Sequence, residues 1–158
     1  MHITDTSASS PRALVVDDDF LSRRMISDSL YSRGFSVEDV DNAEDCLRLL
    51  SDGRPVDLLV SDLRMPSVNG EQLVKSVRAL DSAHAPFILV VTGDVTSRLE
   101  LQLQQAGADA VLSKRLGAPL IASAAEMLVA SRTPPDTFTP AVTMLHERPP
   151  QLARGAVG

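Results

Sequence analysis

Short apolar runs recur along the chain and alternate with segments of helical periodicity. Five of these runs are strand-like, namely 13–16, 36–40, 56–61, 87–91 and 110–113. Between and after them, apolar residues recur every three or four positions, which predicts helices over 20–33, 43–51, 69–80, 96–106 and 119–131. Strands that alternate with helices predict βαβ units, and therefore an α/β fold with one parallel sheet and helices on both faces.

Two of the helical segments carry specific expectations about orientation. In the fourth, Leu99, Leu101 and Leu103 alternate as in a strand, whereas Thr96 is a good N-cap and Gly107 a good residue to end a helix. We predict a helix there, with Leu101 pointing away from the other two leucines. The fifth is expected to bury Leu120, Ile121, Ala124, Leu128 and Val129.

The predicted elements occupy only the middle of the chain. Residues 1–11 are small and polar and end in proline, which predicts a disordered lead-in. Residues 12–131 form one domain that contains every predicted strand and helix. Residues 132–158 contain five prolines and few apolar residues, so we expect a proline-rich tail or linker.

Composition and charge narrow the classes of function. The net charge of −6 argues against a nucleic-acid or anionic-membrane surface, because both require clustered Lys and Arg. A single cysteine excludes an internal disulfide and fits a reducing compartment. No apolar run approaches the length of a membrane helix, and the first residues do not resemble a signal peptide. We therefore expect a cytoplasmic protein.

Polar side chains follow four of the strand-like runs directly. Asp17 and Asp18 follow the first, Asp62 the third, Thr92 the fourth and Lys114 the fifth. Because the carboxyl ends of parallel strands share one edge of a sheet, these side chains should converge. Crowded carboxylates repel one another unless a cation lies between them, and a set of oxygen ligands suits Mg²⁺. The sequence therefore predicts a magnesium site at this edge.

This combination of groups favours phosphoryl-transfer chemistry. Such transfer depends mainly on positioning and charge neutralisation, which a metal ion and Lys114 would supply. Asp62 is the expected nucleophile and would become an acyl phosphate, since Asp17 and Asp18 can hold the metal beside it. Asp19 is expected to cap the first helix and is left off the metal, and Asn42 is expected to cap the second helix.

Four motifs in order resemble the receiver domain of two-component response regulators: Leu14-Val-Val-Asp-Asp-Asp19, Ser61-Asp-Leu-Arg-Met-Pro66, Val91-Thr-Gly93 and Leu112-Ser-Lys114. The resemblance covers roughly residues 12–131, and the intervals between the motifs are similar to those of chemotaxis-type receivers. It implies a flavodoxin-like doubly wound fold with five parallel strands in the order 2-1-3-4-5. It also implies phosphoryl transfer from a phosphohistidine to Asp62.

The resemblance further assigns roles to the predicted site residues. Asp18, Asp62 and the backbone carbonyl of Arg64 would ligate Mg²⁺, with Asp17 holding a metal-bound water. Thr92 would hydrogen-bond the phosphoryl group, and Lys114 would pair with it. On this basis the chain is expected to catalyse only its own phosphorylation and dephosphorylation, and otherwise not to be an enzyme.

Two positions depart from the usual pattern of receivers. Arg115 follows the lysine, where receivers usually have a proline after a cis peptide bond. Val111 stands where receivers often have the Tyr or Phe whose rotamer changes on activation. These departures keep a second hypothesis open, a pseudo-receiver that binds partners but has a lost or altered switch. A Mg²⁺-dependent phosphohydrolase is a third, although its usual Asp-x-Asp strand end is absent here.

The expected partners follow from the same resemblance. A histidine kinase or a histidine phosphotransfer protein would supply the phosphoryl group, and a downstream protein would receive the signal by contact, without a DNA-binding domain. The chain would either act as a stand-alone protein or form the receiver of a hybrid kinase. The 96–131 face is a candidate surface for a homodimer. Arg64 and Asp94 would border the site and adjust the access of water.

Overall fold

The structure is a computed structural model that describes residues 9–81 and 84–132. In this part of the chain the strands are β1 (Arg12–Val16), β2 (Ser36–Val40), β3 (Leu58–Asp62), β4 (Phe87–Thr92) and β5 (Ala110–Ser113). The helices are α1 (Phe20–Ser32), α2 (Ala43–Ser51), α3 (Gly70–Ala79), α4 (Ser97–Ala106), a 3₁₀ turn η1 (Lys114–Leu116) and α5 (Ala118–Ala130). All strand pairs are parallel and the order is β2-β1-β3-β4-β5, which confirms the predicted fold.

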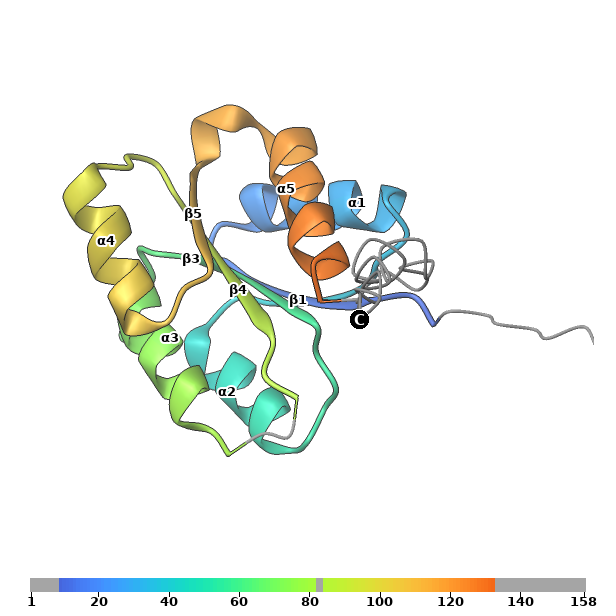
Figure 1. Cartoon of the computed structure of the whole chain (residues 1–158), viewed down its shortest axis with the longest axis horizontal. Coiled ribbons are helices and arrows are strands. Elements are labelled where there is room, and N and C mark those ends of the chain that lie inside the picture. The colour runs from blue at the N-terminus through green and yellow to red at the C-terminus, as the bar shows by residue number, and fades with distance from the viewer. Residues whose placement is uncertain (1–8, 82–83, 133–158) are drawn as a thin grey trace, which may run out of the picture.

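The sheet separates two layers of helices (Figure 1). α1 and α5 cover one face, and α2, α3 and α4 cover the other. Successive side chains of a strand point to opposite faces, so neighbours such as Leu59 and Val60 of β3 enter different cores. The central strands are therefore apolar on both faces until their carboxyl ends, where polar residues begin, as the short apolar runs predicted.

Side-chain caps fix where most helices begin. Asp19, Asn42, Asn69 and Thr96 each accept a hydrogen bond from a main-chain N–H in the first turn of α1, α2, α3 and α4 respectively. The expected cap roles of Asp19, Asn42 and Thr96 are thus confirmed. Each of these helices follows a strand end, so the caps also fix the short loops that carry the strand-end side chains.

Some details of the sequence prediction need correction. Leu120 is 58% exposed rather than buried, because Ala118, Ile121, Ala122 and Ala125 form the inward stripe of α5 and Leu120 lies on another side of the helix. β3 begins two residues later than expected and includes Asp62 as its last residue. The α4 prediction is confirmed, with Leu103 buried and Leu101 exposed.

The ends of the chain add little to these findings. The predicted lead-in and tail lie almost entirely outside the described residues, in 1–8 and 133–158. Among the described residues, no helix is both long enough and apolar enough to cross a bilayer.

Candidate phosphoryl-transfer and metal site

Three carboxylates meet at the carboxyl edge of the sheet. Asp17 and Asp18 follow β1 directly, and Asp62 ends the neighbouring strand β3. Each offers one oxygen, and these oxygens lie within 4.8 Å of one another. Asp17 and Asp62 are buried, whereas Asp18 is exposed to solvent. The structure thus brings together the three acidic residues that the sequence placed in one site.

The ammonium group of Lys114 bridges the two buried carboxylates. Its Nζ lies 2.9 Å from Oδ2 of Asp17 and 3.2 Å from Oδ1 of Asp62. Lys114 begins η1, the single 3₁₀ turn that follows β5, and the Lys114–Arg115 peptide bond is trans. The hydroxyl of Ser113 caps this turn by accepting from the Arg115 N–H at 3.2 Å. The chain therefore places its lysine in the site with arginine, rather than proline, as the next residue.

The surroundings of Asp62 and Lys114 raise the pKa of both groups. Burial raises the pKa of Asp62, and the charge of Asp17 raises it further, which outweighs the lowering by Lys114 and by the Arg64 main-chain N–H. Burial alone would lower the pKa of Lys114, but its bonds to Asp17 and Asp62 outweigh this and raise the pKa. The lysine is therefore cationic at neutral pH. Its single positive charge lies beside three carboxylates.

Thr92 and the loop after it form the next part of the site edge. In the sheet register Asp62 pairs with Val91, so Thr92, which is buried, comes one residue further along β4. Thr92 in turn pairs with Ser113, whose hydroxyl donates to the Gly93 carbonyl at 3.3 Å. A hydrogen bond therefore joins the residue after Thr92 to the residue before Lys114.

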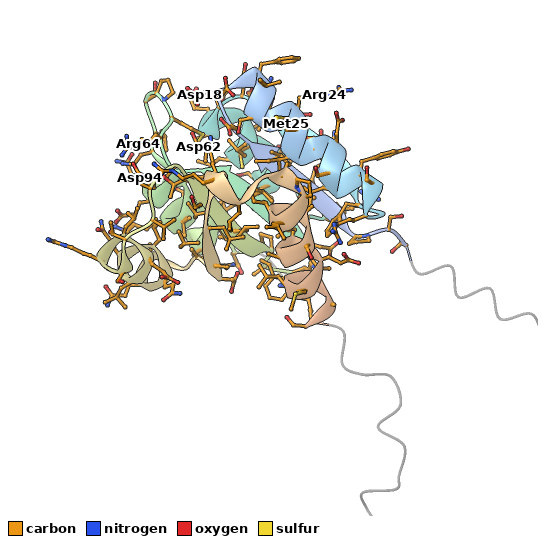
Figure 2. The ribbon with its side chains drawn as sticks, turned by 90° about the horizontal axis from the view of Figure 1, so that it is seen from above. Asp18, Arg24, Met25, Asp62, Arg64 and Asp94 are labelled. Carbon is orange, nitrogen blue, oxygen red and sulfur yellow. The ribbon has the colours of Figure 1, made fainter. Side chains whose placement is uncertain are left out.

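Charged side chains border this edge. Figure 2 shows Arg64 and Asp94 at the same end of the molecule as Asp18 and Asp62. Arg115 pairs with Asp94 at 3.0 Å, and both side chains are largely exposed. An exposed pair of this kind contributes little to stability. Arg64 and Asp94 thus lie where the sequence predicted, and the position of Arg115 beside them was not predicted.

A glycine on α3 lies directly against the main chain of the phosphoacceptor candidate. A Cβ atom added to Gly70 would lie 2.6 Å from the carbonyl oxygen of Asp62 and 2.7 Å from Cα of Leu63. The Gly70 N–H donates to the Leu63 carbonyl at 2.7 Å. The start of α3 therefore supports the end of β3, and only a residue without a side chain fits at this contact.

Further residues that the sequence did not single out hold Asp17. The Ser22 hydroxyl donates to its Oδ2 at 2.6 Å, and Arg23 donates to its main-chain carbonyl at 2.7 Å. Both lie in the first two turns of α1, where a serine and an arginine are ordinary helix residues. They follow Asp17 by five and six residues, and neither residue type at these positions signals a contact with Asp17.

The three carboxylates suit a hard divalent cation. The cluster is made of carboxylate oxygens, and Mg²⁺ binds through one or two carboxylates while keeping several waters. Burial is the main cause of the raised pKa of Asp62, and the repulsion by Asp17 that adds to it is the interaction that a bound cation would relieve. Asp18 and Asp62 would be the ligands, with Asp17 behind them and one position left to the Arg64 carbonyl.

The raised pKa of Asp62 leads to a stability prediction. Replacing Asp62 by asparagine should increase the free energy of unfolding at pH 7 by about 0.5–2 kcal/mol, because it removes an ionised group that the fold disfavours. The protonated form of Asp62 stabilises the fold below its ordinary pKa of 3.8, and this stabilisation is lost as pH rises through the raised value. The advantage of the variant should therefore shrink as pH falls and vanish below 3.8. Urea unfolding of both proteins between pH 3 and 8, without divalent metal, measures it; an advantage that grows on acidification would contradict it.

Known proteins are similar to this chain in sequence and in fold. A family model for the response regulator receiver domain matches residues 13–126. The sensory/regulatory protein RpfC of Xanthomonas campestris pv. campestris (strain 8004) is 32% identical over 138 residues, which cover 85% of this chain but only 18% of RpfC. The two-component response regulator ORR8 of Oryza sativa subsp. indica is 30% identical over 105 residues, or 66% of this chain and 87% of ORR8.

A solved structure agrees with these sequence matches. The signal receiver domain of NarL from Mycobacterium tuberculosis superposes with a TM-score of 0.70 at 25% identity, and covers 78% of this chain and 99% of that domain. The family model spans most of the described domain, including Asp17, Asp62 and Lys114. The chain belongs to the family of response regulator receiver domains of two-component systems.

Proposed function

We propose that the domain is a phosphorylation switch, in which Asp62 accepts a phosphoryl group from a phosphohistidine with the help of Mg²⁺. The observation that carries this proposal is the position of Lys114, whose ammonium lies between Asp17 and Asp62 inside the carboxylate cluster. A cation in hydrogen-bond range of a nucleophilic carboxylate can follow the charge when that carboxylate becomes an acyl phosphate. The donor would be a histidine kinase or a histidine phosphotransfer protein.

The residues of the site have distinct parts in this transfer. A carboxylate oxygen of Asp62 attacks the phosphorus atom; an oxygen–phosphorus bond forms, and the bond from phosphorus to the imidazole nitrogen breaks. The imidazole leaves with the electron pair of that bond. Lys114 and the hydroxyl of Thr92 would then interact with the phosphoryl oxygens. Bound Mg²⁺ would supply charge neutralisation and orientation.

Signalling would proceed by contact with a protein partner. Thr92 ends β4 and Lys114 begins η1, and the hydrogen bond from Ser113 to Gly93 joins these two segments, so movement of either side chain toward the phosphoryl group would displace both segments together. Val111 is buried in the core and offers no aromatic side chain for this task. We infer that this polar link replaces the aromatic read-out, and that the chain catalyses only its own phosphorylation and dephosphorylation. We also propose the 96–131 face as a candidate surface for a homodimer.

Phosphorylation with a small donor tests the proposal. Incubation with Mg²⁺ and acetyl phosphate should add the mass of one phosphoryl group to the wild type, and hydroxylamine should remove it, as for an acyl phosphate. Asp62→Asn should show no adduct, because it lacks the nucleophilic oxygen. Asp28→Asn is the matched control, since Asp28 is an exposed carboxylate on α1 paired with Arg24; it should be modified like the wild type.

The outcomes separate the three hypotheses. An adduct that persists in Asp62→Asn would place the phosphoryl group elsewhere and overturn the role of Asp62. No adduct and no stabilisation by Mg²⁺ would favour a pseudo-receiver. Continuous release of phosphate from unrelated phosphate monoesters would favour a hydrolase.

A further inference from the structure

Asp17 is held by more donors than its place beside the metal site requires. Among the described residues, its Oδ2 accepts from Ser22 Oγ at 2.6 Å and from Lys114 Nζ at 2.9 Å, and its Oδ1 accepts from the Asp19 N–H at 3.0 Å. Arg23 holds its main-chain carbonyl and also pairs with Asp39 of β2. The carboxylate is 1% exposed, so water cannot replace a lost donor readily.

The bond from Ser22 is not needed to build the helix. Ser22 already satisfies its main-chain N–H by donating to Oδ2 of the N-cap Asp19 at 2.8 Å. Its hydroxyl is therefore available for Asp17, and the distance of 2.6 Å is typical of a hydroxyl bound to an ionised carboxylate. The side chain of Ser22 serves the carboxylate, while its main chain serves α1.

This arrangement matters when Lys114 changes partners. If the ammonium turns from Asp17 toward a phosphoryl group on Asp62, Oδ2 of Asp17 loses one of its two donors. With Ser22 in place, Oδ2 keeps a charge-assisted hydrogen bond. Without it, a buried oxygen would lose every donor that the described residues provide, and the departure of Lys114 would become unfavourable.

We propose that Ser22 is a positioning residue for phosphoryl transfer: its hydroxyl keeps Asp17 hydrogen-bonded and so allows Lys114 to leave Asp17 for the phosphoryl group. This rests on the proposed function of Asp62. It assigns Ser22 no contact with the phosphoryl group or with Mg²⁺. The expected effect of losing the hydroxyl is therefore specific to the phosphorylated state.

Calorimetric titration separates this role from a purely structural one. Beryllofluoride, an analogue of the bound phosphoryl group, is titrated into the Mg²⁺-saturated protein, and Mg²⁺ alone is titrated separately. Ser22→Ala should bind beryllofluoride about tenfold more weakly, because its adduct leaves Asp17 short of a donor. Its affinity for Mg²⁺ alone should stay within about threefold of the wild type, since Lys114 then still serves Asp17.

Two further variants keep the result interpretable. Ser22→Thr retains a hydroxyl and should restore the affinity for beryllofluoride. Ser32→Ala removes another hydroxyl from α1. Among the described residues this hydroxyl donates to the Asp28 carbonyl, so its loss should leave the affinities for beryllofluoride and Mg²⁺ unchanged. Three results would each overturn the role of Ser22 but leave the proposed function standing. They are equal beryllofluoride binding by Ser22→Ala and wild type, equal losses of affinity for beryllofluoride and Mg²⁺, and no recovery of affinity in Ser22→Thr. Failure of the wild type to bind beryllofluoride would overturn the proposed function as well.

Discussion

A Gly70→Ala substitution is expected to destabilise the domain by about 1–3 kcal/mol and to slow phosphorylation of Asp62 about a hundredfold. The added methyl group would lie 2.6 Å from the Asp62 carbonyl oxygen and 2.7 Å from Cα of Leu63. Both contacts are to main-chain atoms, so no side-chain rotation relieves them. Either α3 moves away from the sheet or the end of β3 shifts, and the second change carries the phosphoacceptor with it.

The control for Gly70→Ala is the same substitution at a glycine with free space. A Cβ on Gly93 would meet nothing within 4 Å, and its backbone is not in the left-handed region. Gly93→Ala should therefore change the free energy of unfolding by less than about 1 kcal/mol. Urea unfolding measures stability, and the initial rate of acetyl phosphate labelling measures the placement of Asp62. A Gly70→Ala protein as stable and as reactive as the wild type would show that the contact gives way easily.

The sequence predicted the fold because periodicity and capping residues indicated the same elements almost everywhere, with residues 96–106 as the exception. The apolar runs of β1, β3 and β4 could only be buried strands, and caps such as Asn42 and Thr96 marked the helix starts independently. The prediction for Leu120 was wrong because a helix with many alanines can bury a stripe made mostly of small residues, which leaves a large side chain such as Leu120 exposed.

The candidate site was predictable as a set of residues but not as a set of contacts. Strand ends in a parallel sheet meet at one edge whatever their separation along the chain, which is why Asp17, Asp62 and Lys114 could be grouped. The roles of Ser22 and Gly70 depend on how a helix lies against the strand end beside it. The distance between the helix and the strand end depends on packing. A serine or a glycine at these two positions does not reveal that distance in the sequence.

Among variants that keep the nucleophile Asp62, Lys114→Met should have the largest effect on the chemistry, with phosphorylation by acetyl phosphate slowed about 10²–10³-fold. Methionine retains a long side chain but removes the cation that would meet the phosphoryl oxygens. It also leaves the buried carboxylates of Asp17 and Asp62 facing each other without their bridge. Since Lys114 is partly exposed, we expect a loss of about 1–3 kcal/mol in the free energy of unfolding without Mg²⁺, somewhat less than for a fully buried pair.

The same substitution should strengthen the binding of Mg²⁺, because the ammonium and the metal ion would compete for the carboxylate of Asp62. At a Mg²⁺ concentration of about 100 times the dissociation constant, binding contributes about 2.7 kcal/mol to a protein's stability, so the variant, which binds more tightly, should gain more from the metal than the wild type. Lys75→Met is the matched control: Lys75 pairs with Glu71 on the exposed side of α3, and its loss should cost at most about 0.5 kcal/mol with no change in Mg²⁺ affinity. Calorimetric titration of Mg²⁺ and urea unfolding with and without the metal measure both effects. Weaker Mg²⁺ binding by Lys114→Met than by the wild type would mean that the lysine orients the carboxylates for the metal instead of competing with it.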